Sequence, residues 1–207
     1  MTMTLSTTLE AIKIDAILQE QNINGFEAPG GTDKQTIHSY GPVYEALMEP
    51  LVGKAATILE VGVAHGGSMM LWHELLPQGH IIGLDVINAV HPCIFPRMED
   101  SRYHFLMGDA YSATALETVK TLAPNGIDFA IDDGPHTLES QCAFIHAYVP
   151  LLQDEGIAVI EDVQDFRWFD TLKMCVPKNC SYEIVDRRAI KGRYDDLMLI
   201  IKRASNG

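Results

Sequence analysis

Hydrophobic and polar positions follow helical spacing in the first part of the chain. Apolar residues recur every three or four positions over residues 5–20, which predicts a helix there. The stretch NINGFEAPGGTD, residues 22–33, then interrupts any regular element with three glycines and a proline. A second helix is predicted over residues 41–51, with Pro42 in its first turn, where proline is tolerated. Together these segments predict an N-terminal helical cap, residues 1–53, too small to stand alone as a domain.

From residue 54 onward, short apolar runs of strand length alternate with helical segments. Strands are predicted over residues 56–63, 80–86, 103–110, 127–134, 156–163, 181–188 and 195–203, and helices over 68–76, 112–122 and 138–152. This alternation is typical of a mainly parallel sheet with helices on both faces. The last two strands are separated only by a short turn around Gly192, so they are predicted to be antiparallel. We therefore expect residues 1–207 to form a single α/β domain, with residues 54–207 as its core.

The predicted parallel strands end in acids and glycines. In open α/β sheets, ligands bind outside the carboxyl ends of the strands, which lie along one edge. The sequence therefore predicts an acidic cleft at this edge, formed by Glu60-Val61-Gly62, Asp85, Asp109, Asp132-Asp133 and Glu161-Asp162.

The turn after the first of these strands is rich in glycine. In ILEVGVAHGGS, Gly62, Gly66 and Gly67 follow the spacing GxxxGG rather than the GxGxxG of a pyrophosphate-binding loop. A nucleoside-type cofactor fits this spacing, and so does a plain tight turn between a strand and a helix. Asp85 ends the second strand, where an acid accepts two hydrogen bonds from a ribose diol, and Asp109 is placed to receive an adenine amino group. Each acid taken alone is more often a solvated strand end, but three acids in this order favour a nucleoside site.

The net charge narrows the choice of ligand. The chain has 15 lysines and arginines against 28 acids, for a formal net charge of −13. Such a balance disfavours duplex nucleic acid and anionic membrane surfaces as partners, because both require a basic face. No apolar stretch reaches the roughly 18 to 20 residues that a membrane span needs, and no basic leader precedes the first apolar positions. We expect a cytoplasmic protein whose partner is a small molecule, with a cation to neutralise the acids.

Three of the acids are expected to share one cleft. Asp133 follows the fourth strand, Glu161 and Asp162 follow the fifth, and these strands are neighbours in sheets of this kind. Carboxylates that crowd together repel one another, and a divalent cation such as Mg²⁺ removes that penalty. The alternative is that one acid caps a helix and another pairs with Arg167 or Arg187.

His136 lies three residues beyond Asp133, next to the start of the following helix. From there its imidazole leans over the same cleft without having to be a metal ligand. Because imidazole titrates near neutral pH, His136 is the predicted general base for a hydroxyl. A metal would assist by lowering the pKa of that hydroxyl.

A first set of motifs carries a family resemblance. The pattern E-x-G-x-x-x-G-G, a following strand that ends in Asp85, and the later GDA resemble the class I S-adenosylmethionine-dependent methyltransferases. The resemblance implies a Rossmann-like fold with a seven-stranded sheet and an antiparallel last strand. It also implies an S-adenosylmethionine site formed by Glu60, Gly62, Gly66, Gly67, Ser68, Asp85, Asp109, Ala110 and Asp133.

A second set of motifs is more specific. DDGPH, followed by VIEDV and preceded by GTDKQTIHSYGPVYEAL, resembles the metal-dependent macrolide sugar O-methyltransferases of the mycinamicin and macrocin type, and the related cephalosporin hydroxylase-like proteins. By this resemblance, Asp133, Glu161 and Asp162 hold Mg²⁺ and His136 is the base. The chain departs from the usual D-G-S-H at Pro135, which stiffens the turn and removes a hydroxyl. This departure leaves the metal triad untouched.

Several residues are candidates for a lid or for contacts with the acceptor. By the resemblance, the loop Thr32-Asp33-Lys34 and Tyr40 fold over the cofactor or the acceptor, although the loop by itself is equally a helix-capping segment. Trp168 and Phe169, just past the fifth strand, form either an apolar wall for the acceptor or part of the core. The full candidate set is Thr32, Asp33, Lys34, His38, Tyr40, Trp168 and Tyr194, with Arg193 and Asp195 beside the last of these.

These features favour a Mg²⁺-dependent O-methyltransferase that uses S-adenosylmethionine to methylate a hydroxyl of a sugar or of a glycosylated small molecule. One alternative is a metal-dependent hydroxylase or oxidoreductase of the cephalosporin hydroxylase-like type, for which the sequence has no obvious triad of two histidines and one carboxylate. The other is a non-catalytic nucleoside-binding protein, which would have no use for His136 beside three acids. The sequence leaves the acceptor open, and the N-terminal helix pair is a candidate interface for a homo-oligomer.

Overall fold

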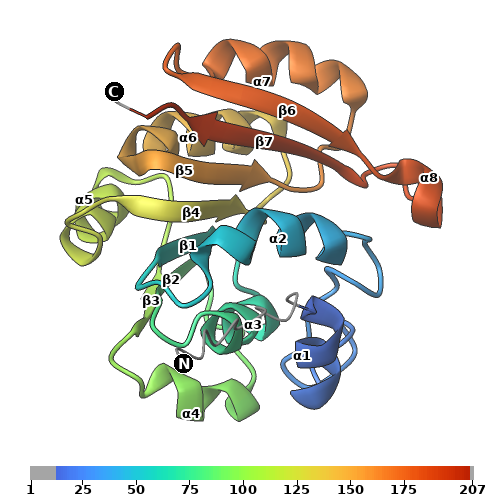
Figure 1. The fold of residues 1–207 in the computed structure, drawn as a ribbon, viewed down its shortest axis with the longest axis vertical. Helices are drawn as coiled ribbons and strands as arrows, with labels where there is room; N and C mark the ends of the chain where they lie inside the picture. Colours follow the sequence, from blue (N-terminus) through green and yellow to red (C-terminus); the bar gives the residue numbers. More distant parts are fainter. Residues whose placement is uncertain (1–12, 206–207) are drawn as a thin grey trace, which may run out of the picture.

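A single seven-stranded sheet runs through the computed structural model, which describes residues 13–205 (Figure 1). Its order is β3-β2-β1-β4-β5-β7-β6, in which β1 to β5 pair in parallel and β7 is antiparallel to both β5 and β6. The predicted α/β fold with a mainly parallel sheet and an antiparallel last strand is confirmed. The strands are β1 Thr57–Val61, β2 His80–Asp85, β3 Tyr103–Met107, β4 Ile127–Asp132, β5 Leu152–Ile160, β6 Cys180–Asp186 and β7 Leu197–Arg203.

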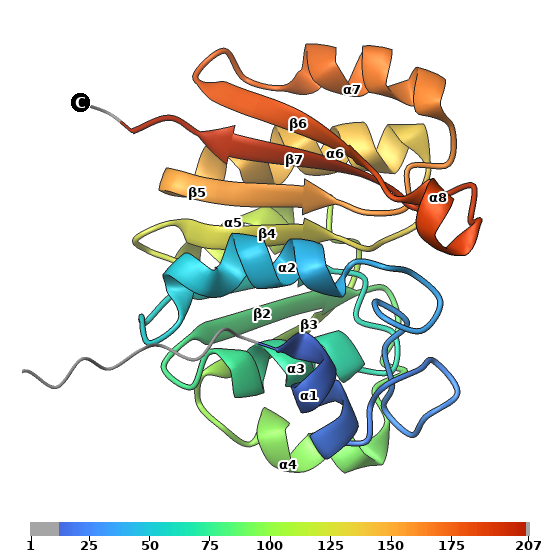
Figure 2. The same ribbon diagram turned by 45° about the vertical axis from the view of Figure 1, so that its right-hand side comes forward.

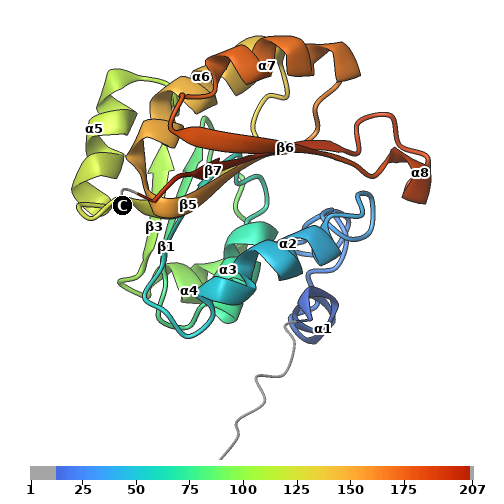
Figure 3. The same ribbon diagram turned by 45° about the horizontal axis from the view of Figure 1, so that its top comes forward.

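Helices cover both faces of this sheet, as Figure 3 shows. One face carries α1 Ile14–Glu20, α2 Gly41–Met48, α3 Gly67–Leu75 and α4 Phe95–Met98. The other face carries α5 Ala113–Leu122, α6 Leu138–Tyr148 and α7 Phe169–Cys175. A short helix, α8 Arg188–Lys191, lies beyond the sheet between β6 and β7.

Each face of the sheet buries its own hydrophobic cluster. On one face, the ring centroid of Tyr44 in α2 lies 5.0 Å from that of Trp72 in α3 and 6.0 Å from that of Phe129 in β4. The other cluster includes Phe144 of α6 and Ala130 of β4. Because successive residues of a strand point to opposite faces, a strand covered on both sides has to be apolar throughout. This explains why the strand runs in the sequence are mainly apolar, with Glu60 in β1 and Asp128 in β4 among the exceptions.

The boundary between α6 and β5 differs most from the prediction. Helix α6 ends at Tyr148 rather than at residue 152, and a 3₁₀ turn over Val149–Leu151 leads directly into β5. Strand β5 begins at Leu152 rather than at residue 156, because it pairs with β4 across a register shift. The first part of β5 reads QDE after Leu152, so a hydrophobicity pattern does not show its extended conformation.

The short helices α4, α7 and α8 have no counterpart among the predicted elements, because none exceeds seven residues and none is periodic. Helix α7 decides between the two interpretations of Trp168 and Phe169 in favour of the core. Phe169, a candidate for the acceptor wall, is its first residue and is only 1% exposed in the core. Trp168 precedes it in a 3₁₀ turn and packs against the same cluster.

The N-terminal helix predicted over residues 5–20 corresponds to α1 in the described part of the chain, and residues 5–12 lie outside it. Helix α1 buries Ile14 and Leu18 in the cluster that also contains α3. Within residues 13–205, no helix combines the length and the apolar character needed to cross a membrane.

The carboxyl ends of the parallel strands lie along one edge of the sheet, and the segment between α1 and α2 crosses the same edge (Figure 2). The register pairs Val61 with both Leu84 and Asp132, and pairs Asp132 with Ile160. The residues that follow these positions therefore lie next to one another at this edge. This arrangement agrees with the acidic edge that the sequence predicted.

Candidate active site

A cavity of about 470 Å³ opens at this edge of the sheet. Small-molecule sites commonly measure roughly 300 to 1,000 Å³. The segment before α2 supplies part of the wall, and the loops after β1 to β5 supply the rest. The lining consists of Phe26, Gly31, Thr32, Asp33, Val61, Gly62, Val63, Ala64, Gly67, Ser68, Leu84, Asp85, Val86, Gly108, Asp109, Ala110, Tyr111, Asp133, Gly134, Pro135, His136 and Asp162.

Two glycines of the turn after β1 are required because other backbone segments pack against them. Gly62 has φ +91°, and a Cβ there would lie 1.8 Å from the carbonyl oxygen of Asp133. Gly67 begins α3, and a Cβ on it would lie 2.4 Å from the carbonyl carbon of Gly31. The glycines therefore allow the end of β4 and the segment before α2 to approach the turn, and both of these segments line the cavity.

Asp85 connects this turn to the end of β2. Its Oδ2 accepts hydrogen bonds from the backbone N–H groups of Val63 and Ala64, at 2.9 Å each, and its Oδ1 accepts one from Ile87 at 3.2 Å. A carboxylate oxygen has two lone pairs, so Asp85 keeps acceptor capacity for a diol in the cavity. Asp109 lines the neighbouring wall of the cavity.

Asp133, His136 and Asp162 form another part of the wall, with their ligand-type atoms within 4.8 Å of one another. His136 Nε2 lies 3.8 Å from Asp133 Oδ1 and 3.7 Å from Asp162 Oδ2. His136 and Asp162 have left-handed backbones, with φ of +53° and +52°, as does Ala64 in the glycine turn, at +44°. Residues other than glycine rarely adopt this conformation, and such strain clusters at functional sites.

The side chains of Tyr40 and His38, from the N-terminal segment, contact Asp162 on the side away from the cavity. The hydroxyl of Tyr40 donates to Asp162 Oδ1 at 2.5 Å, and His38 Nδ1 lies 3.3 Å from the same oxygen. The two rings stack with their centroids 4.8 Å apart. Burial and then repulsion from Asp133 raise the pKa of Asp162 to about 6, although His38, Tyr40 and His136 oppose the shift.

Lys34 neutralises the most deeply buried acids of the site. Its buried Nζ lies 2.6 Å from Glu161 Oε2, 2.8 Å from Asp133 Oδ2 and 3.4 Å from Glu60 Oε1. The other oxygen of Glu161 accepts a hydrogen bond from the hydroxyl of Tyr44 at 2.7 Å. Burial by itself lowers the pKa of Lys34, but the attraction of the three carboxylates outweighs it, so the pKa is raised. Burial is also the main reason that the pKa of Glu161 is raised.

The sequence left open a pairing of a site acid with Arg167 or Arg187. In the structure, Arg167 pairs with Asp165, and Arg187 donates to the hydroxyl of Ser39 at 3.2 Å. Lys34 takes this role instead, because the segment before α2 inserts its side chain among the ends of β1, β4 and β5.

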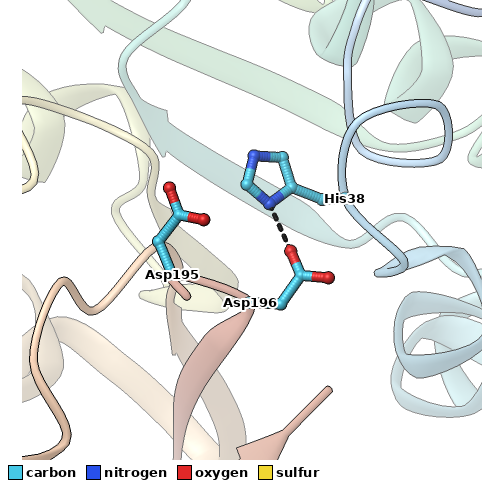
Figure 4. A group of neighbouring side chains, drawn as sticks. All are labelled: His38, Asp195 and Asp196. Carbon is cyan, nitrogen blue, oxygen red and sulfur yellow. Dashed lines mark hydrogen bonds and ion pairs between the residues drawn. The ribbon is translucent and has the colours of Figure 1, made fainter. Parts of the chain in front are cut away.

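A second group of buried ligand-type side chains consists of His38, Asp195 and Asp196 (Figure 4). His38 Nδ1 lies 2.7 Å from Asp196 Oδ1, and Asp196 Oδ2 accepts a hydrogen bond from Ser39 at 3.2 Å. Both oxygens of Asp195 accept hydrogen bonds from Arg193, at 3.0 and 2.7 Å. Every carboxylate oxygen of the group thus has a protein partner, so the group fixes His38 behind Asp162 rather than forming an open ion site.

The structure brings most of the predicted site residues to the cavity. Those that line it are Thr32, Asp33, Gly62, Gly67, Ser68, Asp85, Asp109, Ala110, Asp133, His136 and Asp162. Those buried behind the wall are Lys34, His38, Tyr40, Glu60, Gly66 and Glu161. Two candidates are not part of it: Trp168 packs against the core, and Tyr194 is 64% exposed, with its hydroxyl donating to Gln164 at 2.7 Å.

Several residues of the site were not predicted, and four of them make contacts that matter for its geometry or charge. Phe26 and Tyr111 line the cavity, Tyr44 holds Glu161, and Asp196 holds His38. Only Asp196 gave a local signal, as an acid directly before the apolar run of the last strand. The aromatic residues look like ordinary core positions, because their role depends on contacts between distant parts of the chain.

A family model described as a methyltransferase domain matches residues 59–163, just over half of the chain. The chain belongs to this methyltransferase domain family. The matched segment of the methyltransferase domain includes the glycine turn, Asp85, Asp109 and the group of Asp133, His136 and Asp162. The family resemblance seen in the sequence motifs is therefore confirmed.

Two curated relatives match about two thirds of this chain. One, 8-demethyl-8-alpha-L-rhamnosyl tetracenomycin-C 2'-O-methyltransferase of Streptomyces olivaceus, is 30% identical over 145 residues, covering 67% of this chain and 36% of that protein. The other, mycinamicin VI 2''-O-methyltransferase of Micromonospora griseorubida, is 27% identical over 153 residues, covering 70% of this chain and 36% of that protein. The chain thus spans little more than a third of the length of these relatives.

The fold of the methyltransferase domain also matches a solved structure. MycE methyltransferase from the mycinamycin biosynthetic pathway, in complex with Mg and SAH, has a TM-score of 0.67 and 19% identity, covering 95% of this chain and 56% of that chain. The seven-stranded Rossmann-like methyltransferase fold expected from the motifs is therefore confirmed.

Proposed function

We propose that this methyltransferase domain transfers the methyl group of S-adenosylmethionine to a hydroxyl of a sugar or of a glycosylated small molecule, with the help of a divalent cation. One observation carries the proposal: a single cavity contains both the glycine turn with Asp85 and the group of Asp133, His136 and Asp162. The names of the two relatives, which describe O-methylation of a rhamnosyl tetracenomycin and of mycinamicin VI, support the choice of acceptor class.

In this proposal, the cofactor lies along the glycine turn. Asp85 accepts hydrogen bonds from the ribose diol, and Asp109 and Ala110 meet the adenine. Glu60 is buried next to the glycine turn and would support it without lining the cavity. Its Oε2 accepts a hydrogen bond from the indole N–H of Trp72 at 3.0 Å. The methionine part would contact Gly62, Gly67 and Ser68 beside Asp133, with Gly66 shaping the turn as the left-handed N-cap of α3.

The residues present fit a hard divalent ion such as Mg²⁺. Asp133 and Asp162 each have one oxygen held by the N-terminal segment and the other turned toward His136. Oxygen ligands of this kind suit Mg²⁺, and a cation relieves the repulsion between the two carboxylates. Glu161 is the proposed third ligand. Its Oε2 is bonded to Lys34 Nζ at 2.6 Å, so it would exchange this ammonium for the ion.

His136 is the proposed general base. Its Nε2 takes the proton of the acceptor hydroxyl while that oxygen bonds to the methyl carbon, and the carbon–sulfur bond breaks with its electron pair left on sulfur. Asp133 Oδ1 and Asp162 Oδ2, both within 3.8 Å of Nε2, place the imidazole beside the carboxylates that would hold the ion. The bound cofactor supplies the methyl group, and a bound cation lowers the pKa of the hydroxyl. The chain itself contributes orientation, because the strand ends hold the base and both substrates in one cavity.

The two alternatives explain less of the site. Non-haem iron oxygenases use two histidines and one carboxylate, whereas each of the two candidate metal groups among residues 13–205 contains a single histidine. A nucleoside-binding protein without catalysis would account for the glycine turn and Asp85. It would not account for the left-handed His136 beside two carboxylates.

Isothermal titration with S-adenosylhomocysteine tests the cofactor site. Wild type is expected to bind, and Asp85→Ala to bind at least about tenfold more weakly, because it loses both the diol acceptor and the anchor of the glycine turn. Asp170→Ala, which removes an exposed acid of α7, is the matched control and should bind like wild type. No binding to wild type would contradict the proposal.

Methyl transfer is tested with labelled S-adenosylmethionine and a panel of rhamnosides and other glycosides, in Mg²⁺ and in EDTA. Label on a glycoside hydroxyl that depends on the divalent ion is the expected result. Binding of the cofactor product without transfer to any acceptor would instead favour the nucleoside-binding alternative.

A further inference from the structure

The ammonium group of Lys34 lies among the carboxylates of the proposed metal site, where a bound metal ion would otherwise balance their charge. An ammonium group has three N–H donors, and Lys34 Nζ has three carboxylates around it, from Glu161 at 2.6 Å, Asp133 at 2.8 Å and Glu60 at 3.4 Å. The side chains of Lys34, Glu60 and Glu161 are at most 2% exposed. Charges buried to this degree are screened little by water or salt.

No other lysine or arginine within residues 13–205 forms a salt bridge with these three acids. Asp162 adds a fourth carboxylate, supported by Tyr40 and His38. When all four are ionised, one ammonium leaves three negative charges. A divalent ion together with the sulfonium of S-adenosylmethionine would neutralise this remainder.

We propose that Lys34 is a resident counter-ion that competes with the divalent cation for Asp133 and Glu161, and thereby sets how tightly this protein binds metal. The inference rests on the proposed metal site. Lys34 is a positioning residue: in the metal-free protein it holds the buried carboxylates together. Because an ammonium and a divalent ion repel each other across the same carboxylates, Lys34 weakens metal binding.

The same side chain connects the metal site to the cavity wall. Lys34 directly follows Thr32 and Asp33, which line the cavity, and it reaches Glu60 in β1, just before the glycine turn. An ion that displaces the ammonium from Glu161 would therefore also change the position of the Thr32-Asp33 loop. It would remove the salt bridge between Lys34 and Glu60 as well.

Lys34→Met tests the proposal, because it keeps most of the side-chain length and removes the charge. Mn²⁺ is the probe, measured by isothermal titration and by the electron paramagnetic resonance signal of the free ion. The variant is expected to bind Mn²⁺ at least about tenfold more tightly than wild type, because a nearby positive charge is lost from a poorly screened site. Lys120→Met removes the charge of an exposed pair with Glu117 and should leave Mn²⁺ binding unchanged.

If Lys34 had only a structural role, Lys34→Met would weaken Mn²⁺ binding rather than strengthen it. A folded Lys34→Met protein that binds Mn²⁺ no more tightly than wild type overturns the proposal, as does the absence of binding to both proteins. Binding by the variant alone supports it, because the ammonium would then be what excludes the ion from the wild-type site.

Wild type gives an answer even if Lys34→Met fails to fold. In a ¹⁵N-lysine NMR spectrum, the ammonium signal of Lys34 is expected to resist exchange with solvent and to shift as Mg²⁺ is added. An unchanged signal at saturating Mg²⁺ overturns the proposal. Titration of the same samples with S-adenosylhomocysteine separates the two proposals. If the protein binds this ligand but Mg²⁺ does not change the Lys34 signal, the proposed role of Lys34 is wrong. The proposed transfer of a methyl group from S-adenosylmethionine would still stand.

Discussion

At the scale of single residues, the site contains acids whose burial is only partly compensated. Asp132, next to Asp133, is 2% exposed, and its Oδ2 has no hydrogen-bond partner in the structure. Its Oδ1 accepts a long hydrogen bond of 3.4 Å from Tyr111. Burial, and then repulsion from Asp133, raise the pKa of Asp132 to about 8. Asp132 is therefore protonated in the folded protein at neutral pH.

The shifted pKa of Asp132 predicts that stability falls as pH rises. The ordinary value is 3.8, so between about pH 4 and pH 8 the folded state keeps a proton that the unfolded chain has lost. This contribution to stability is fully present below the unfolded value and is lost as pH rises to the folded value. Asp132→Asn mimics the protonated acid and should flatten this part of the profile. Urea unfolding at about pH 5, 7 and 9 measures the difference, and parallel profiles for the two proteins would contradict it.

His136 is the residue whose loss should separate chemistry from cofactor binding. His136→Ala is expected to lower turnover by roughly 10² to 10⁴, because the base is gone, while affinity for S-adenosylhomocysteine changes little. Steady-state methyl transfer and isothermal titration give the two quantities. His146→Ala, at an exposed position of α6, is the control. A loss of affinity as large as the loss of turnover would mean that His136 shapes the cofactor site instead.

The positions of site residues were predictable from the sequence where a strand end fixes them. Asp85, Asp133 and His136 belong to this class, because each lies at or just after a strand. Glu161 follows a strand too, but its contacts with Lys34 and Tyr44 depend on a segment more than a hundred positions away along the chain. No local pattern contains that information.

At the scale of elements, the turn from β1 to α3 is the most constrained connection. Gly62→Ala combines a left-handed backbone with a Cβ only 1.8 Å from the carbonyl oxygen of Asp133, which cannot move without β4. Gly53→Ala is a matched control, with φ +76° and no atom within 4 Å of the added carbon. The control should cost about 1–2 kcal/mol of stability. Gly62→Ala should cost more and should abolish binding of S-adenosylhomocysteine.

Thermal unfolding and isothermal titration on both glycine variants check this expectation. Equal destabilisation of the two proteins, with cofactor binding retained in both, would contradict this expectation. It would show that the backbone at Asp133 can move away from the added Cβ at little cost in stability. The turn would then be constrained only by its backbone conformation.

Elements were predictable to the extent that their pattern is periodic. The apolar runs of β1, β2 and β4 are long enough and continuous enough to mark central strands. Helices α4 and α7 are too short for a periodic pattern, and the polar residues near the start of β5 lie at the register shift between β4 and β5. Tertiary contacts determine these segments, so the sequence pattern did not indicate them.

At the scale of the whole molecule, binding of a divalent ion should appear as global stability. An ion that binds only the folded protein raises the free energy of unfolding by about 2.7 kcal/mol at roughly 100 times its Kd. Urea unfolding in Mg²⁺ and in EDTA, at fixed ionic strength, measures the increment. Asp162→Asn is expected to remove it, and Asp170→Asn to keep it.

Monovalent salt provides the necessary comparison, because a chain with a net charge of −13 also gains stability from general screening. A gain of the same size in sodium chloride of equal ionic strength would assign the effect to screening, and no specific ion site would be needed to explain it.

The order of strands and helices along the chain was enough to predict the layered architecture, because parallel neighbours need crossover helices. The position of the N-terminal segment over the carboxyl edge was not predictable in the same way. It depends on the fit of Gly31 against Gly67 and on the salt bridges of Lys34, which join parts of the chain that are distant in sequence.

The contacts of Lys34 also bear on how far this protein can be shortened. The family match begins at residue 59 and ends at residue 163, so a fragment cut at those limits would keep the acids that follow β1 to β5. It would lose Lys34, His38 and Asp196, which make the burial of those acids tolerable. The segment matched by the family model is therefore shorter than the segment that this protein needs to neutralise its buried acids.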